Sequence, residues 1–271
     1  MLKKATNKKL VFAKKSFGQN FLVDQNYISK IIAALNPKEG ETIVEIGAGR
    51  GALTEHLVES GAKIIAIELE HEMIAVLRER FAGSENFQLV EADALKIDFN
   101  ELVNPDSAKL VANLPYYIST AILQKLIEQR EVFSEMVLMF QLEVVERIAA
   151  EVGNSERGFL TVMTEAYLDS EKLFDVPPSA FRPSPKVNSA VVQLKPKRET
   201  VVEDAELFRA VVSAAFVQKR KTIYNNLRNL RLKNSDEIDW LKVLNAAEIE
   251  PVRRAESLRL DEWEKLISNL K

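Results

Sequence analysis

The chain has 271 residues, of which 46% are hydrophobic, and its formal net charge is −3 at pH 7. This length allows one large or two modest domains, and the lack of cysteine excludes disulfides, thiolate nucleophiles and cysteine–zinc sites. The two histidines, His56 and His71, do not form a metal-ligand motif, and no apolar run approaches the roughly 18 residues that a membrane span requires. We therefore expect neither a metal site nor a membrane partner.

The charges are distributed unevenly along the chain. Residues 1–23 contain six lysines and no acid, and residues 207–233 contain seven basic residues and no acid. The rest of the chain holds 24 basic and 40 acidic residues. Basic clusters of this kind are typical of phosphate binding, although solvated surface segments are the alternative interpretation. The first segment has lysine, a single serine (Ser16) and no arginine, whereas transit peptides are typically rich in arginine and serine, so we expect a cytoplasmic protein.

Short β-rich runs alternate with helical stretches from about residue 42 onward. The predicted strands are Thr42–Ile46, Lys63–Ile67, Phe87–Val90, Leu110–Ala112, Glu135–Phe140 and Val187–Leu194. The predicted helices are Ala52–Ser60, His71–Phe81, Thr120–Gln129 and Leu142–Ala150. This alternation indicates an α/β fold with a parallel sheet, which binds ligands at the carboxyl ends of its strands.

Strand signals end near residue 200, where the pattern becomes helical up to Lys271. We place a domain boundary at about 198–203. The prediction is an α/β domain over 1–200, which includes the basic N-terminal arm, and an all-helical, RNA-binding domain of about four helices over 201–271.

A glycine-rich turn, residues 45–51, follows the first predicted strand. Its G-x-G-x-G spacing, at Gly47, Gly49 and Gly51 with Glu45 two residues ahead of Gly47, favours a nucleoside without phosphates over a dinucleotide. Such turns also occur without any ligand. Glu68 follows the second strand, 21 residues after Gly47, where an acid typically holds ribose hydroxyls. Asp93 follows the third strand and could accept a hydrogen bond from an adenine amine.

A fourth strand end carries the quartet Asn113-Leu114-Pro115-Tyr116. The Asn113 side-chain oxygen and the Leu114 carbonyl could accept both hydrogens of an exocyclic amine. Pro115 stiffens the turn, and Tyr116 offers a stacking face for a base. A plain strand-to-turn junction is the alternative. Because four strand ends carry Gly, Glu, Asp and Asn, we predict a pocket for S-adenosylmethionine.

Three further segments are candidates for binding. Phe181, held by neighbouring prolines, could be displayed opposite Tyr116 as a second aromatic surface on which the base stacks. Arg182 and Lys186 could then bind phosphates. Burial of Phe181 in the core is the alternative. Asn20 and Leu22 precede the first helix and could close over the cofactor, or Leu22 could belong to the core.

The third candidate segment is basic. Lys219, Arg220 and Lys221 are consecutive cations next to paired amides and could face RNA, or they could form a solvated helix end.

Taken together, these motifs resemble the universal ribosomal RNA adenine N6,N6-dimethyltransferase family, which modifies two adjacent adenines near the 3′ end of small-subunit (16S) rRNA. The motifs are GQNFL (18–22), EIGAGRGALT (45–54), NLPYYIS (113–119), FRPSPKVNSAVV (181–192), FVQKRKTIYNNL (216–227) and RAESL (254–258).

The resemblance implies a Rossmann-like methyltransferase domain with a small helical domain attached. It also implies contacts to S-adenosylmethionine at Asn20, Leu22, Gly47, Glu68, Asp93 and Asn113, with the target adenine between Tyr116 and Phe181. The implied partner is small-subunit rRNA within a pre-30S particle, and a monomer is expected. Three alternatives stay open: a large-subunit adenine methylase of the macrolide-resistance type, an assembly factor that acts mainly by binding, and a small-molecule methyltransferase.

Overall fold

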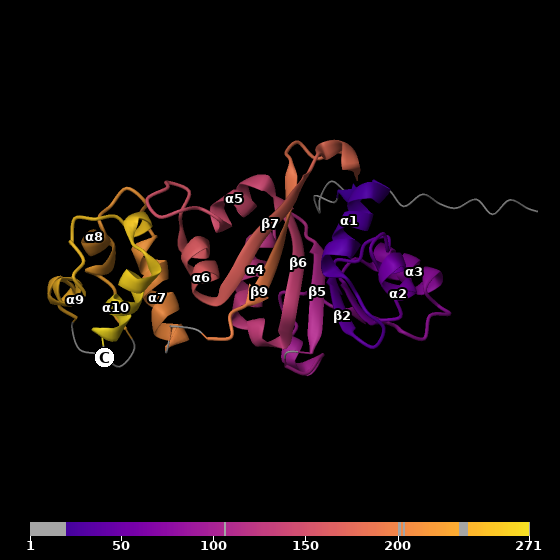
Figure 1. Ribbon diagram of the computed structural model, residues 1–271, viewed down its shortest axis with the longest axis horizontal. Helices are drawn as coiled ribbons and strands as arrows, with labels where there is room; N and C mark the ends of the chain where they lie inside the picture. Colours follow the sequence, from indigo (N-terminus) through magenta and orange to yellow (C-terminus); the bar gives the residue numbers. More distant parts are fainter. Residues whose placement is uncertain (1–19, 106, 200–201, 203, 233–237, 271) are drawn as a thin grey trace, which may run out of the picture.

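The computed structural model describes residues 20–105, 107–199, 202, 204–232 and 238–270. The basic N-terminal arm, with Gly18 and Gln19 of the first motif, lies outside these ranges, as does Lys233. The main sheet consists of β2 (Thr42–Ile46), β3 (Lys63–Glu68), β4 (Phe87–Glu91), β5 (Ala108–Asn113), β6 (Phe133–Gln141), β7 (Leu168–Val176) and β9 (Ser189–Pro196). Its strand order is β4-β3-β2-β5-β6-β9-β7 (Figure 1).

The first five strands of the sheet are parallel, which confirms the predicted α/β fold. β9 is antiparallel to both of its neighbours, β6 and β7. It begins at Ser189, two residues later than predicted, because Val187 is exposed. β7 was not predicted, since it is an edge strand whose central residues are largely exposed and it lacks a continuous apolar run.

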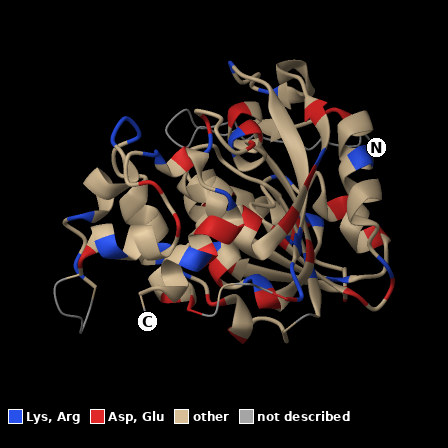
Figure 2. Ribbon diagram, turned by 60° about the vertical axis from the view of Figure 1, so that its left-hand side comes forward, with Lys and Arg blue, Asp and Glu red and all other residues tan. Residues whose placement is uncertain are grey.

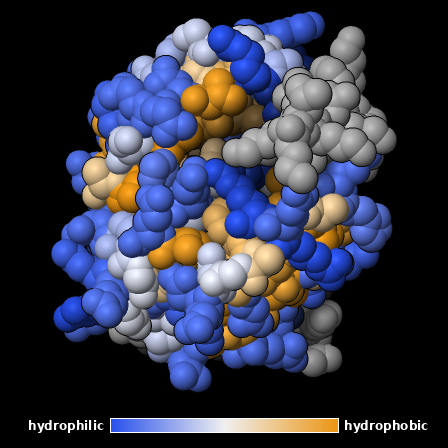
Figure 3. Space-filling view, turned by 90° about the vertical axis from the view of Figure 1, so that its right-hand side faces the viewer, coloured by the Kyte–Doolittle hydropathy of each residue, from blue (hydrophilic) through white to orange (hydrophobic). Residues whose placement is uncertain are grey.

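Helices cover both faces of the sheet. The α/β part contains α1 (Gln25–Leu35), α2 (Thr54–Glu59), α3 (His71–Arg80), α4 (Ser119–Glu128), α5 (Leu142–Ile148) and α6 (Phe159–Tyr167). In β2, Ile43 packs with α1 and α2, whereas its neighbour Val44 packs in the cluster that contains α4 to α6. Both side chains are fully buried, as expected for a sheet covered on two faces. The end of the molecule that carries α1 to α3, at the right of Figure 1, is mostly hydrophilic on its surface (Figure 3).

The described residues from 204 onward form helices and no strand. They are α7 (Ala205–Ala215), α8 (Ile223–Leu227), α9 (Trp240–Ala246) and α10 (Leu260–Ser268). Four short 3-10 helices, η2 (Phe99–Glu101), η3 (Arg130–Val132), η4 (Pro178–Ala180) and η5 (Ala255–Ser257), complete the helical elements that the structure describes. Within the described ranges, every helix is too short or too polar to span a bilayer.

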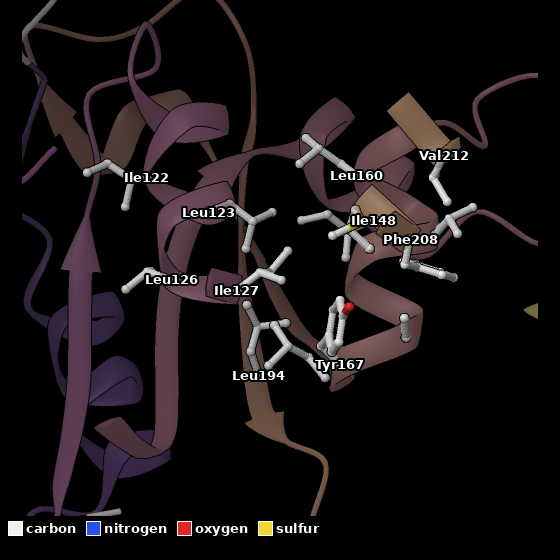
Figure 4. Close-up of a cluster of buried hydrophobic side chains, with 14 of the residues drawn as sticks. Ile122, Leu123, Leu126, Ile127, Ile148, Leu160, Tyr167, Leu194, Phe208 and Val212 are labelled. Atoms are coloured by element: carbon white, nitrogen blue, oxygen red, sulfur yellow. The ribbon is translucent and has the colours of Figure 1, made fainter. Parts of the chain in front are cut away.

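One apolar cluster joins the C-terminal helices to the sheet. Phe208 and Val212 of α7 point toward Leu160 and Tyr167 of α6 and belong to the same buried cluster as Leu194 of β9 (Figure 4). The rings of Tyr167 and Phe208 meet edge to face with centroids 6.1 Å apart. The two parts of the chain therefore do not have separate cores, and the division near residue 200 stays a prediction.

A buried arginine adds a polar link at this junction. Arg157 is 2% exposed and forms an ion pair with Glu165 of α6 at 2.5 Å. The same guanidinium donates to the carbonyls of Ala150 at 3.3 Å and Leu258 at 3.4 Å. Because Leu258 lies next to η5, this side chain connects the α5–α6 region to the C-terminal helices.

Glu45 is a buried carboxyl group in the middle of the apolar strand β2. It is 2% exposed, and the Thr54 hydroxyl donates a hydrogen bond to its Oε2 at 2.6 Å. Burial raises the pKa of Glu45 from 4.5 to about 7; the Thr54 hydrogen bond opposes this shift and the nearby Glu68 adds to it. The folded protein therefore binds a proton at Glu45 over a pH range in which the unfolded chain does not.

The contact between α6 and α7 predicts a large stability loss on truncation. Phe208→Ala should lower the free energy of unfolding by about 3–5 kcal/mol, because a fully buried ring leaves a cavity. Urea unfolding followed by circular dichroism measures this change. Val217→Ala, at a side chain that is 72% exposed, is the control and should change stability by less than about 0.5 kcal/mol. Equal losses for the two variants would contradict a shared core.

The buried Glu45 predicts a pH dependence of known sign. The pKa of Glu45 is higher in the folded protein than in the unfolded chain. Its contribution to the free energy of unfolding is therefore fully present below about pH 4.5 and is lost as the pH rises through about 7. Glu45→Gln cannot ionise, so its stability relative to the native protein should rise by on the order of 3 kcal/mol between pH 5 and pH 8. Urea midpoints across this range test the prediction, and parallel profiles for the two proteins would refute it.

Candidate functional site

The predicted site residues meet at one edge of the sheet because their strands are parallel neighbours. Ile46, the last residue of β2, lies opposite Ile67 of β3 and Ala112 of β5. Gly47, Glu68 and Asn113 are the next residues along these three strands, so the register places them side by side. The convergence that the strand pattern predicted is therefore present in the structure.

A first pocket, which we call the Asn113 pocket, opens at this edge. It has about 550 Å³ of empty space, part of it open to solvent. Its lining residues are Asn20, Phe21, Gly47, Gly49, Glu68, Asn113, Leu114, Pro115, Tyr116 and Phe181. Sequence reasoning had proposed all of these as site residues except Phe21. The Arg50 guanidinium stacks over the Phe21 ring, 4.2 Å from the ring centroid.

A second pocket, the Asp93 pocket, adjoins the first, because Gly47, Glu68 and Pro115 line both. It has about 930 Å³ of empty space, again partly open to solvent, and also contains Asp93. Leu69 and Tyr117 are 55% and 64% exposed and give its wall two apolar surfaces. Both residues were missed, although Leu69 directly follows the predicted ribose-binding acid and could have been found from that position.

Glu68 connects the end of β3 to the glycine-rich turn. Its Oε2 accepts a hydrogen bond from the Gly49 N–H at 2.9 Å, and its Oε1 accepts from the N–H groups of Leu69 and Glu70 at 2.8 and 3.0 Å. An ionised carboxylate can accept about four hydrogen bonds, so one position on Oε2 remains for a ligand hydroxyl. Asp93 similarly uses one oxygen, Oδ1, for the Leu95 N–H at 3.0 Å.

The glycine-rich turn has no room for larger side chains at its end. Gly51 has φ +80°, and a Cβ there would lie 2.8 Å from the Phe81 ring. Arg80, next to Phe81, donates hydrogen bonds to the carbonyls of Arg50 at 2.7 Å and Gly51 at 3.2 Å. The C-terminal end of α3 therefore fixes the turn at Arg50 and Gly51, whereas Glu68 holds it at Gly49.

Asn113 presents an unused amide to its pocket. Across the part of the chain that the structure describes, its side chain has no hydrogen-bond partner, and it is only partly buried. The Leu114 side chain is 2% exposed and anchors the turn in the core, and the Pro115 carbonyl accepts from the Ile118 N–H at 3.2 Å. The amide and the peptide group that follows it are thus held by a fixed turn.

Tyr116 is tethered to two serines. Its phenol oxygen lies 2.8 Å from the Ser189 hydroxyl, and its carbonyl accepts from the Ser119 hydroxyl at 2.8 Å. Burial raises the pKa of the Tyr116 phenol, against the effect of the Ser189 hydrogen bond, so the ring stays neutral. Sequence reasoning did not identify Ser189, which begins a strand and is followed by three apolar residues.

Two predictions need correction. Phe181 is not displayed as a free plate: it is 1% exposed, packs in the core with α1, and contributes only to the wall of the Asn113 pocket. Leu22 is 4% exposed in the same core and lines neither pocket, so its side chain is not placed to pack on a cofactor. The reason is a short antiparallel pair, β1 (Phe21–Leu22) with β8 (Phe181–Arg182), which turns both side chains inward.

The predicted RNA-binding cations are exposed. Arg182 is held on its own segment by the carbonyls of Ser179 and Phe181, and Lys219 donates to the Ser155 carbonyl at 3.2 Å. The remaining three, Lys186, Arg220 and Lys221, have no partner among the described residues. Figure 2 shows Lys and Arg on loops and helix ends of the C-terminal helical part.

Comparisons with known proteins agree with this geometry. A family model described as ribosomal RNA adenine dimethylase matches residues 11–265. Proteins named ribosomal RNA small subunit methyltransferase A from Saccharophagus degradans and Pseudomonas aeruginosa are each 42% identical over 261 residues, which is 95% of this chain and 94% of each relative.

Solved structures show the same similarity. A dimethyladenosine transferase from Plasmodium falciparum has a TM-score of 0.77 at 29% identity and covers 91% of this chain and 95% of its own. The 23S rRNA methyltransferase ErmE has a TM-score of 0.67 at 25% identity, and the match covers 93% of this chain and 99% of ErmE. These findings confirm the resemblance seen in the motifs: the chain is a methyltransferase and belongs to the ribosomal RNA adenine dimethylase family.

Proposed function

We propose that this enzyme transfers methyl groups from S-adenosylmethionine to N6 of two adjacent adenines near the 3′ end of small-subunit (16S) rRNA. The products are N6,N6-dimethyladenosines, made during biogenesis of the small subunit. The observation that carries this proposal is the unpaired Asn113 amide, held by a fixed turn beside the Leu114 carbonyl and the Tyr116 ring in one pocket.

The residues of the two pockets fit the proposed cofactor. Glu68 retains one acceptor position for a ribose hydroxyl, and Asp93 retains an oxygen for an adenine amine next to the apolar surfaces of Leu69 and Tyr117. Asn20, Gly47 and Gly49 line the adjoining space. When bound, S-adenosylmethionine supplies an electrophilic methyl group on a positively charged sulfur.

The chain's own groups activate the target amine. The lone pair of adenine N6 is delocalised into the ring, which makes the amine a poor nucleophile. When Asn113 Oδ1 and the Leu114 carbonyl accept its two N–H groups, the nitrogen moves toward tetrahedral geometry and its lone pair becomes available. Alignment of this kind can contribute about 7–11 kcal/mol to catalysis. A second methylation needs only one remaining N–H to be held.

No dedicated base is required for this reaction. Once N6 has used its lone pair to form the new bond, its N–H becomes strongly acidic, and water can accept the proton. The target base must leave its stack to reach the pocket, and the Tyr116 face with the Phe181 wall gives it an aromatic environment. A metal ion has no step to perform in this mechanism.

We further propose that the substrate is rRNA within a pre-30S particle and that the enzyme acts as a monomer in the cytoplasm. Residues 1–200 would form the catalytic unit, and the helical residues 201–271 would contribute RNA contacts. The large-subunit alternative has weaker support, because relatives with small-subunit names are 42% identical whereas the large-subunit enzyme is 25% identical.

Removing the Asn113 amide tests the proposal directly. Asn113→Ala should lower the rate of methyl transfer to unmethylated small subunits by about 10²–10³-fold, because one of two fixed acceptors is lost. Subunit binding should be nearly unchanged. Incorporation of labelled methyl groups into adenine N6 is the measurement, with Asn100→Ala, an exposed amide away from the pockets, as the control. Persistent transfer by Asn113→Ala would contradict the role given to this residue.

Salt dependence tests the basic segment. Arg220→Gln with Lys221→Gln should weaken binding to small subunits and make the slope of log affinity against log salt shallower by about 0.7–0.9 per lost phosphate contact. The matched control is Lys172→Gln, because Lys172 is already paired with Asp175 at 2.8 Å. Filter binding at several salt concentrations measures both slopes, and an unchanged slope in the double variant would remove this segment from the RNA interface.

A further inference from the structure

Ser189 is a buried polar residue at the start of β9. It is 0% exposed, and the next residues of β9, Ala190, Val191 and Val192, are at most 1% exposed. Its backbone is fixed on both sides, since Ser189 lies opposite Gln141 of β6 and Val176 of β7. Burying a hydroxyl without a hydrogen-bond partner costs free energy, so the Ser189 hydroxyl is expected to have a partner in the folded protein.

The side-chain partner of Ser189 is the phenol oxygen of Tyr116, at 2.8 Å. This contact comes from outside the turn that carries Tyr116, because β9 lies on the far side of β6 from β5. The backbone of Tyr116 is held separately by the Ser119 hydroxyl, which is itself 1% exposed. The tyrosine is thus held at its carbonyl and at the tip of its ring. Rotation about the first side-chain torsion would carry the phenol oxygen away from Ser189, so the hydrogen bond fixes the place of the ring in the pocket.

We propose that Ser189 is a positioning residue that holds the Tyr116 ring in one place in the pocket, so that an extruded adenine meets a preformed stacking surface. The inference rests on the proposed function and adds to it a residue with no contact to the substrate. Without the hydrogen bond, the side chain can leave this rotamer and move the ring away from its place beside Asn113. The bound base is then aligned with the Asn113 amide for a smaller fraction of the time, which affects the chemical step more than RNA binding.

Kinetics distinguish positioning from a structural role. Ser189→Ala should lower kcat for methylation of unmethylated small subunits by about tenfold, with KM for subunits and the affinity for S-adenosylmethionine within about twofold of the native values. Tyr116→Phe removes the same hydrogen bond without changing β9 and should lower kcat by a similar factor. The double variant should be no slower than either single variant. Ser134→Ala, an exposed serine at the other end of β6, is the control.

An activity-independent measurement completes the test. In protein labelled with 3-fluorotyrosine, the resonance absent from Tyr116→Phe is that of Tyr116. It should move toward the shift of free 3-fluorotyrosine in Ser189→Ala and stay in place in Ser134→Ala. An unmoved resonance, or additive kcat losses in the double variant, would overturn the proposal. If the native enzyme transfers no methyl group, the proposed function fails, whereas the resonance still reports whether Ser189 orients the ring.

Discussion

The parallel register of β2, β3 and β5 is the constraint on which the site depends. It places the carboxyl ends of these strands at the same level, so that Gly47, Glu68 and Asn113 become neighbours although they are far apart in the chain. Glu68 then converts this proximity into a fixed geometry, because its carboxylate accepts from the backbone of the glycine-rich turn and from its own strand end. Loss of this register would separate the proposed cofactor residues from the amide that we propose acts on the target base.

The Asn113 pocket is completed by segments from opposite ends of the α/β part. The pairing of β1 with β8 brings Phe21 and Phe181 into the lining of one pocket, and the N–H groups of Val23 and Asp24 both donate to the Ala180 carbonyl. The segment before α1 and the segment before β9 therefore form one structural unit. This arrangement joins the cofactor side of the pocket to the side proposed for the base.

The C-terminal helices are part of the same packed body. Their buried residues continue the cluster on the α4–α6 face of the sheet, and Arg157 adds a buried ion pair and carbonyl contacts at the junction. Cations in the loop between α7 and α8 are thus carried on a helical layer that is packed firmly against the catalytic part. A shared core of this kind would let the RNA contacts that we propose for the helices define where the target base enters the site.

The sequence alone determined the parallel strands, the glycine-rich turn and the polar residues at the strand ends. These features are local: an apolar run predicts a buried strand, and the residue that follows it must lie at the edge of the sheet. The tertiary structure decided the inward orientation of Leu22 and Phe181, the edge strand β7 and the Ser189–Tyr116 hydrogen bond. Each of these depends on contacts between segments distant in the chain, and a side chain's own neighbours in sequence do not reveal what lies across from it.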